Sequence, residues 1–123
     1  MTITINDERK IYEIQEEFNN IFPYLRIEFF SKSNKADGVT SKKTIKHCSK
    51  TIGECRTINK DGNVTITPQM TVANLDLCFN DIFGISIQLF RKSGTVWLET
   101  TVTDSWTLEE QNRQGESLSR NVI

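Results

Sequence analysis

The fold class follows from residues 71–89, which have the sequence TVANLDLCFNDIFGISIQL. Thr71 is a typical helix N-cap, and Gly84 occupies the position where a left-handed C-cap ends a helix. Between them, apolar residues recur at the spacing of one helix face: Val72, Leu75, Phe79 and Ile82. After Gly84, apolar and polar residues alternate through Leu89 with the two-residue period of a strand. The stretch therefore predicts a helix followed at once by a strand.

A second unit of this kind occurs near the N-terminus. Isoleucine and threonine alternate over residues 3–5, which favours a short strand, and Asn6 or Asp7 is the expected N-cap of the next helix. The apolar face of that helix comprises Ile11, Ile14, Phe18 and Ile21. Pro23 ends the helix, and residues 24–30 alternate with period two. One face of this strand carries Leu25, Ile27 and Phe29, and the other carries Tyr24, Arg26, Glu28 and Phe30.

The residues between the two units carry weaker patterns. Residues 31–43 hold almost no apolar side chain, which is typical of a mobile loop. A short amphipathic helix is expected over 44–55, on the spacing of Ile45, Cys48, Ile52 and Cys55. Residues 56–58 and 64–67 then flank an Asp-Gly pair, which favours a tight turn, so we expect a hairpin there.

A second hairpin and a final helix are expected at the C-terminal end. Residues 96–103 alternate with period two, and the polar turn 91–94 joins them to the preceding strand. Thr107 and Glu110 form the pattern of a capping box, which starts a helix that we expect to end at Gly115.

These elements predict one α+β domain over residues 1–123. The expected architecture is a two-layer sandwich, with a mostly antiparallel sheet and helices on one face. Its order is ferredoxin-like β-α-β-β-α-β or a variant with extra strands. We expect residues 31–60 to form a basic, partly mobile insertion and residues 116–123 to form a flexible tail.

Composition places the chain among ordinary globular proteins. It has 123 residues, of which 37% are hydrophobic, and this is enough for one core. No stretch approaches the ~20 apolar residues of a membrane span, and the first residues lack the pattern of a signal peptide. The three cysteines, Cys48, Cys55 and Cys78, include no CxxC pair, which suits a reducing compartment. We therefore expect a cytoplasmic protein without contact to a membrane.

Positive charge is concentrated in residues 31–60, which hold eight lysines and arginines against two acidic residues, although the whole chain has a net charge of −1. Such a segment can follow the phosphates of a polyanion such as RNA, with Lys42, Lys43 and Lys46 as the leading residues. The pI near 5.8 and the lack of aromatic residues within the segment argue against this interpretation, since a solvated surface has the same composition.

The candidates for metal binding and catalysis are few. His47, Cys48, Cys55 and Glu54 include the right atoms for zinc, but they lack the closely paired ligands of structural zinc sites. With one histidine in the chain, any Ser-His or Cys-His mechanism must use His47, and Asp104 is the only carboxylate worth testing as an acid or base. We expect no metal and no cofactor, and an enzyme of unknown type is the least favoured function.

The C-terminal hairpin gives the leading functional hypothesis. Trp97 falls on the face opposite Val96, Leu98 and Val102, so it needs a cover. Either the terminal helix covers it, with Leu108 packed there and Trp106 acting as a staple, or it anchors a partner. Tryptophan and arginine are the favoured anchors of interfaces, and the expected binding residues are Arg91, Lys92, Trp97 and Trp106. The chain is thus expected to be a non-catalytic protein-interaction or self-association module, with polyanion binding through residues 32–60 as the alternative.

Overall fold

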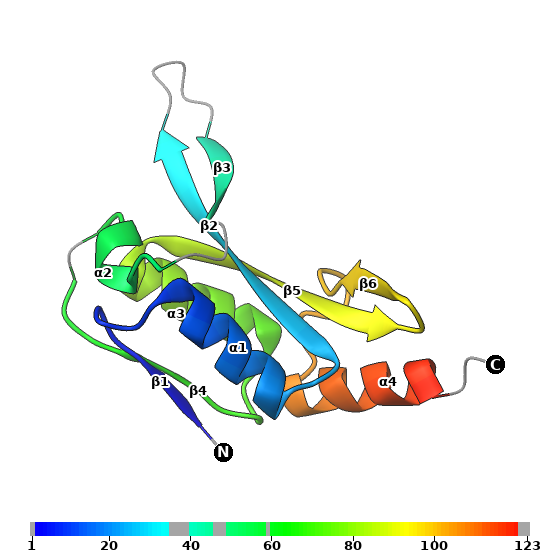
Figure 1. The fold of residues 1–123 in the computed structure, drawn as a ribbon. Helices are drawn as coiled ribbons and strands as arrows, with labels where there is room; N and C mark the ends of the chain where they lie inside the picture. The colour runs from blue at the N-terminus through cyan, green and yellow to red at the C-terminus, as the bar shows by residue number, and fades with distance from the viewer. Residues whose placement is uncertain (1, 35–39, 46–48, 59, 121–123) are drawn as a thin grey trace.

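The computed structural model describes residues 2–34, 40–45, 49–58 and 60–120, and it contains two copies of one element order (Figure 1). The first copy comprises β1 (Ile3–Ile5), α1 (Ile11–Ile21), β2 (Leu25–Asn34), β3 (Thr40–Ile45) and α2 (Ile52–Cys55). The second comprises β4 (Val64–Ile66), α3 (Val72–Phe83), β5 (Ile85–Ser93), β6 (Val96–Glu99) and α4 (Leu108–Arg120). Both predicted strand–helix–strand units are therefore confirmed, as β1-α1-β2 and β4-α3-β5.

The strands form two antiparallel sheets, in which β1 pairs with its counterpart β4 and β2 with its counterpart β5, while β3 and β6 lie at the two edges of the larger sheet. A four-stranded sheet has the order β3-β2-β5-β6, and β1 pairs with β4 in a separate two-stranded sheet. This is a mixed α+β fold consistent with a two-layer sandwich, as predicted. The ferredoxin-like order is not confirmed, because the two strands that flank α1 belong to different sheets, and so do the two that flank α3.

The core lies between the four-stranded sheet and its helices. Its sheet side is formed by alternate residues of β2 and β5, namely Leu25, Ile27, Phe29, Ile85, Ile87 and Leu89. Phe29 meets Phe79 of α3 with ring centroids 5.4 Å apart. Helices α1 and α3 also contact β1 and β4, whose isoleucine and valine side chains are buried. Each such side chain contributes about 1.5–3 kcal/mol on burial.

The capping residues predicted from the sequence are correct for α3 but not for α1. Thr71 Oγ1 accepts the Asn74 N–H at 3.1 Å, and Gly84 has φ 65°, so both predicted caps are confirmed. Helix α1 begins only after Lys10, so neither Asn6 nor Asp7 is its N-cap. Asn6 Oδ1 instead accepts the Glu8 N–H, which closes a turn before the helix. None of the helices in the described part of the chain is long and apolar enough to cross a membrane.

The region between the two units differs from its prediction. Parts of the expected loop 31–43 are strand, because β2 extends to Asn34 and pairs with β3. Ile45 ends β3 opposite Phe29, and only Ile52–Cys55 of the expected helix over 44–55 is helical. The apolar pairing of Ile45 with the buried Phe29 holds β3 on the sheet, although its other residues show no strand pattern.

The expected hairpin between 56–58 and 64–67 is wrong. Val64–Ile66 pairs with β1 instead, in the register Ile3 to Ile66 and Ile5 to Val64. That pairing buries four apolar side chains, whereas the segment before the turn could offer only Ile58, which is exposed. At the C-terminal end, the turn of the second hairpin is Gly94 and Thr95 rather than 91–94, and β6 ends at Glu99.

The terminal helix is longer than predicted. Glu110 N–H donates to Thr107 Oγ1 at 3.1 Å, so the predicted N-cap is confirmed. The helix passes through Gly115 and continues to Arg120, so residues 116–120 are helical rather than a tail. The tail residues 121–123 lie outside the described residues, and the division of the chain into domains stays a prediction.

Candidate protein-interaction surface

One face of the four-stranded sheet points away from α1, α3 and α4. Directly paired residues of antiparallel strands point to the same side, so the register defines the side chains on this face. Beyond the pair formed by Phe30 and the buried Ser86, they are Arg26 and Glu28 of β2, Gln88, Phe90 and Lys92 of β5, and Trp97 and Glu99 of β6. All seven are partly or fully exposed. We call this set the open sheet face.

Trp97 is held in place on the open sheet face by an arginine. The guanidinium of Arg26 lies 5.4 Å from the centroid of the Trp97 ring, and its Nη2 is 3.5 Å from Glu28 Oε1. A cation above an indole ring contributes about 0.5–1 kcal/mol at an exposed site. Leu108 is buried in the core on the other side of the sheet, so it does not cover Trp97. The ring is half-buried and remains accessible.

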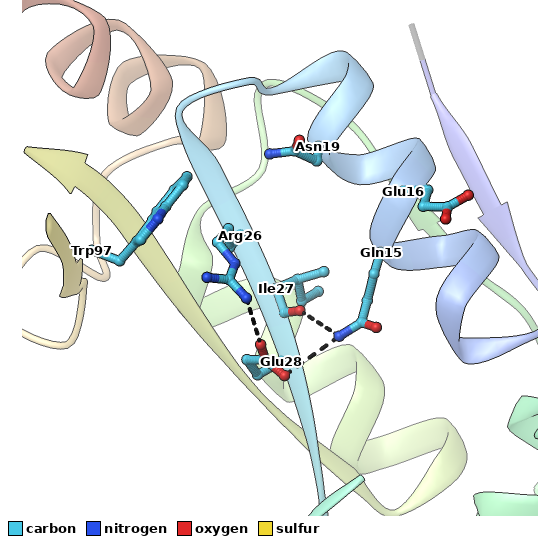
Figure 2. Close-up of a pocket in the computed structure, with 7 residues that line it drawn as sticks. All are labelled: Gln15, Glu16, Asn19, Arg26, Ile27, Glu28 and Trp97. Carbon is cyan, nitrogen blue, oxygen red and sulfur yellow. Dashed lines mark hydrogen bonds and ion pairs between the residues drawn. The ribbon is translucent and has the colours of Figure 1, made fainter. Parts of the chain in front are cut away.

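A pocket of about 430 Å³ adjoins Trp97 (Figure 2). It is lined by Gln15, Glu16, Asn19, Arg26, Ile27, Glu28 and Trp97. Gln15 Nε2 donates to the Ile27 carbonyl at 3.0 Å and to Glu28 Oε2 at 3.4 Å. Both partners are acceptors, which fixes the orientation of the amide. Gln15 Oε1 points away from Ile27 and Glu28 (Figure 2) and is buried without a hydrogen-bond partner among the described residues.

Arg91 and Trp106 lie on the opposite side of the sheet from Trp97. The Arg91 guanidinium stacks 5.3 Å from the Trp106 centroid, and Nη1 donates to Gln111 Oε1 of α4 at 2.8 Å. These contacts fasten the terminal helix to β5. Of the predicted turn residues, only Lys92 shares the open sheet face with Trp97, to which it is directly paired.

The apolar residues on the strand face opposite Trp97 are not buried. Val96 is 53% exposed, Leu98 45% and Val102 96%. The reason is their position, since β6 is an edge strand and α4 packs on β5 and β2, while Val102 follows the end of β6. The register nevertheless places Leu98 on the face opposite Trp97, as the alternation predicts.

Sequence reasoning did not assign the β2 residues of this surface or the polar residues of α1 to a site. Alternation over residues 24–30 had placed Arg26 and Glu28 on one face of a strand, and that was the available signal. Gln15 carried no signal, because its role depends on the packing of α1 beside β2.

The basic segment forms part of a two-stranded ribbon that projects from the body of the molecule (Figure 1). Lys42 is paired with Lys32 and Lys43 with Ser31 across β2 and β3. Lys46, His47 and Cys48 lie outside the described residues. Within the part of the chain that is described, no three His, Cys, Asp or Glu residues gather as a metal site.

Asp104, the carboxylate named as a possible acid or base, is exposed, and it is not among the residues that line the pocket beside Trp97. The backbone carbonyl of Asp104 accepts the Ala73 N–H at 2.9 Å, and this hydrogen bond helps to position the start of α3.

Comparison with known proteins yields no family model, no curated protein and no solved structure that matches this chain.

Proposed function

We propose that this chain is a non-catalytic protein-interaction or self-association module that binds through Trp97 and the open sheet face. The observation that carries the proposal is the half-buried Trp97 ring, fixed by Arg26 beside a pocket. A large aromatic ring held in one orientation loses little conformational freedom on binding. Tryptophan and arginine also dominate the energetics of measured interfaces.

The pocket limits the chemistry of what binds there. Trp97 supplies an apolar surface, the Glu28 carboxylate supplies an acceptor, and the Arg26 guanidinium supplies donors. The best fit is a peptide segment that packs against Trp97 and places a donor beside the Glu28 carboxylate or an acceptor beside the Arg26 guanidinium.

A peptide library tests this proposal without a known partner. Phage-displayed random peptides would be selected on the parent chain and then measured against Trp97→Ala and Arg26→Ala. We expect Trp97→Ala to weaken the selected peptides about tenfold or more, which corresponds to 1.4 kcal/mol. Leu77→Ala is the matched control, because Leu77 is 66% exposed on α3, outside the open sheet face. Failure to recover any Trp97-dependent peptide would contradict the proposal.

Polyanion binding is a second candidate, favoured by the register of the β2–β3 ribbon. Lys32 and Lys42 hold paired positions in the register of β2 and β3, within a segment whose eight lysines and arginines outnumber its two acidic residues. Lys42→Gln should reduce the salt dependence of single-stranded RNA binding by about one phosphate contact, whereas Lys10→Gln, just before α1, should not. An RNA that shows no retarded species with the parent chain at low salt would exclude this candidate.

We further propose a cytoplasmic location. Cys78 is an exposed thiol outside any disulfide, which is compatible with a reducing compartment. Alkylation of Cys78 in intact cells by a membrane-permeant maleimide, but not by an impermeant one, would support it. Labelling by both reagents would contradict it.

A further inference from the structure

The free parts of β2 and β5 are covered by side chains of their own helices. Next to α1, the carbonyl of Leu25 accepts from Asn19 Nδ2 at 2.9 Å, and the carbonyl of Ile27 accepts from Gln15. Exposed strand edges are templates for pairing with other chains, and native proteins block them. These two amides therefore block the edge of β2 where β3 does not reach.

The corresponding part of β5 is covered in the same way. Asp76 Oδ1 of α3 accepts the Ile87 N–H at 2.9 Å. Thr100, which follows β6, donates from both its N–H and its hydroxyl to the Leu89 carbonyl. The two halves of the molecule thus protect equivalent edges with different side chains.

The outer strands are protected to different degrees. Strand β3 carries Lys42 and Lys43, and lysine on an edge strand discourages pairing. Strands β1 and β4 have three residues each, which is too short to form a long template. Strand β6 has the sequence Val-Trp-Leu-Glu, without lysine or proline, and two of its apolar side chains are about half exposed. Among the described strands, β6 has the least protected edge.

The hydrogen-bonding groups of β6 that point outward can be identified from its neighbours. The Lys92 N–H donates to Tyr24 O at 2.9 Å, away from β6, so the Lys92–Trp97 pair is not hydrogen-bonded. Outward directions alternate along a strand, and the N–H and C=O groups of Trp97 and Glu99 therefore lie on the outer edge.

We propose that β6 pairs antiparallel with β6 of a second copy of this chain, around a two-fold axis at Leu98. The inference rests on the proposed function, because it names the partner that the Trp97 strand binds. In this register Trp97 of each copy bonds to Glu99 of the other through the backbone, and the two Leu98 residues form the central non-hydrogen-bonded pair. Such an interface is isologous and closes after two copies.

Charge and apolar surface both fit a second copy. The Glu99 carboxylate of one copy would lie beside Trp97 of the other, where Arg26 is stacked with half of its side chain exposed. The opposite charges thus meet on the open sheet face. On the other side of the sheet, pairing would cover Leu98 and Val96, which are exposed in the single chain. The net charge of −1 leaves little repulsion between two copies.

Sedimentation equilibrium of the full chain over a wide concentration range tests the pairing. We expect a monomer–dimer equilibrium whose dissociation constant rises about tenfold or more in Leu98→Lys. Leu77→Lys is the control, since it places the same charge at an exposed leucine on α3. A parent chain that stays monomeric, or a dimer unaffected by Leu98→Lys, would overturn the inference.

Disulfide trapping tests the register. Leu98→Cys should form an interchain disulfide on mild oxidation, because non-hydrogen-bonded antiparallel pairs have Cα atoms about 4.5 Å apart, within disulfide range. Val102→Cys is more exposed but lies beyond β6, so it should cross-link no faster than the parent chain with its own cysteines. Equal rates for the two variants would reject the two-fold axis at Leu98.

These results also separate the inference from the proposed function. A monomeric chain that binds Trp97-dependent peptides refutes the second copy as partner and leaves the interaction module standing. A monomeric chain that binds no such peptide refutes both.

Discussion

Arg91 and Gln111 join the sheet to the terminal helix through a direct hydrogen bond, in which Arg91 Nη1 of β5 donates to Gln111 Oε1 of α4 at 2.8 Å. Gln111 is fully buried, and its Nε2 donates to the backbone and hydroxyl oxygens of Thr103 at 2.6 and 2.8 Å. One buried amide therefore connects β5, the turn after β6 and α4.

Gln111→Leu should destabilise the fold although leucine has nearly the same volume. The change removes the partner of Arg91 Nη1 and of Thr103, and each buried polar group left unsatisfied costs about 1–3 kcal/mol. We expect the free energy of unfolding in urea to fall by about 2–4 kcal/mol. Gln114→Leu is the control, because Gln114 bonds only to Glu110 of its own helix among the contacts described. Equal losses would mean that the Gln111 amide contributes nothing beyond its volume.

Gly115→Ala should also destabilise the fold, against the expectation from helix propensity. Alanine in the interior of a helix gains about 1 kcal/mol over glycine. A Cβ at Gly115 would, however, lie 2.8 Å from Tyr24 Cβ and 3.1 Å from Arg91 Cγ. Helix α4 would have to move off the sheet, so we expect a lower melting temperature. Ser117→Ala, at an exposed position of the same helix, should raise it slightly or leave it unchanged.

Gly115 shows why some elements could be predicted and others could not. The caps at Thr71 and Gly84 are local, since each is defined by groups within a few residues along the chain. Gly115 has the sequence signature of a helix end, but it is glycine because another strand approaches it closely. The pairing of β4 with β1 is likewise decided by burial between distant segments, which no local pattern records.

The candidate site was predictable to a similar extent. The position of Trp97 opposite Leu98 in the alternation is local and correct, because the strand period fixes it. The packing of α4 decides which face of the sheet is covered. The alternation of apolar and polar residues in β6 does not reveal this, because an edge strand and a central strand can have the same alternation. Arg91 was grouped with Trp97 because they are close in sequence, yet they lie on opposite sides of the sheet.

Arg56 belongs to the basic segment in sequence but serves the fold in structure. Its guanidinium donates to Asp7 Oδ1 at 2.6 Å and to the carbonyls of Ile58, Lys60 and Ile82, and it stacks on the Phe83 ring. Lysine cannot reproduce this planar set of donors. We therefore expect Arg56→Lys to lower the free energy of unfolding by about 1.5–3 kcal/mol, measured in urea. The exposed Arg113→Lys is the control, and an equal effect would contradict the structural role of Arg56.

Asn19→Leu should make the free part of β2 available for pairing. The change removes the amide that covers the Leu25 carbonyl, and it should lower the free energy of unfolding by about 0.5–1.5 kcal/mol. The variant is measured by sedimentation in a Leu98→Lys background, so that any self-association that appears must use an edge other than β6.

Asn20→Leu is the control, because it adds the same apolar side chain at the next, exposed position of α1. If the two variants sediment alike, added hydrophobicity rather than the opened edge causes association, and the protective role of Asn19 fails. If only Asn19→Leu associates, the side chains of α1 keep the sheet from pairing at β2, and β6 remains the edge left for a partner.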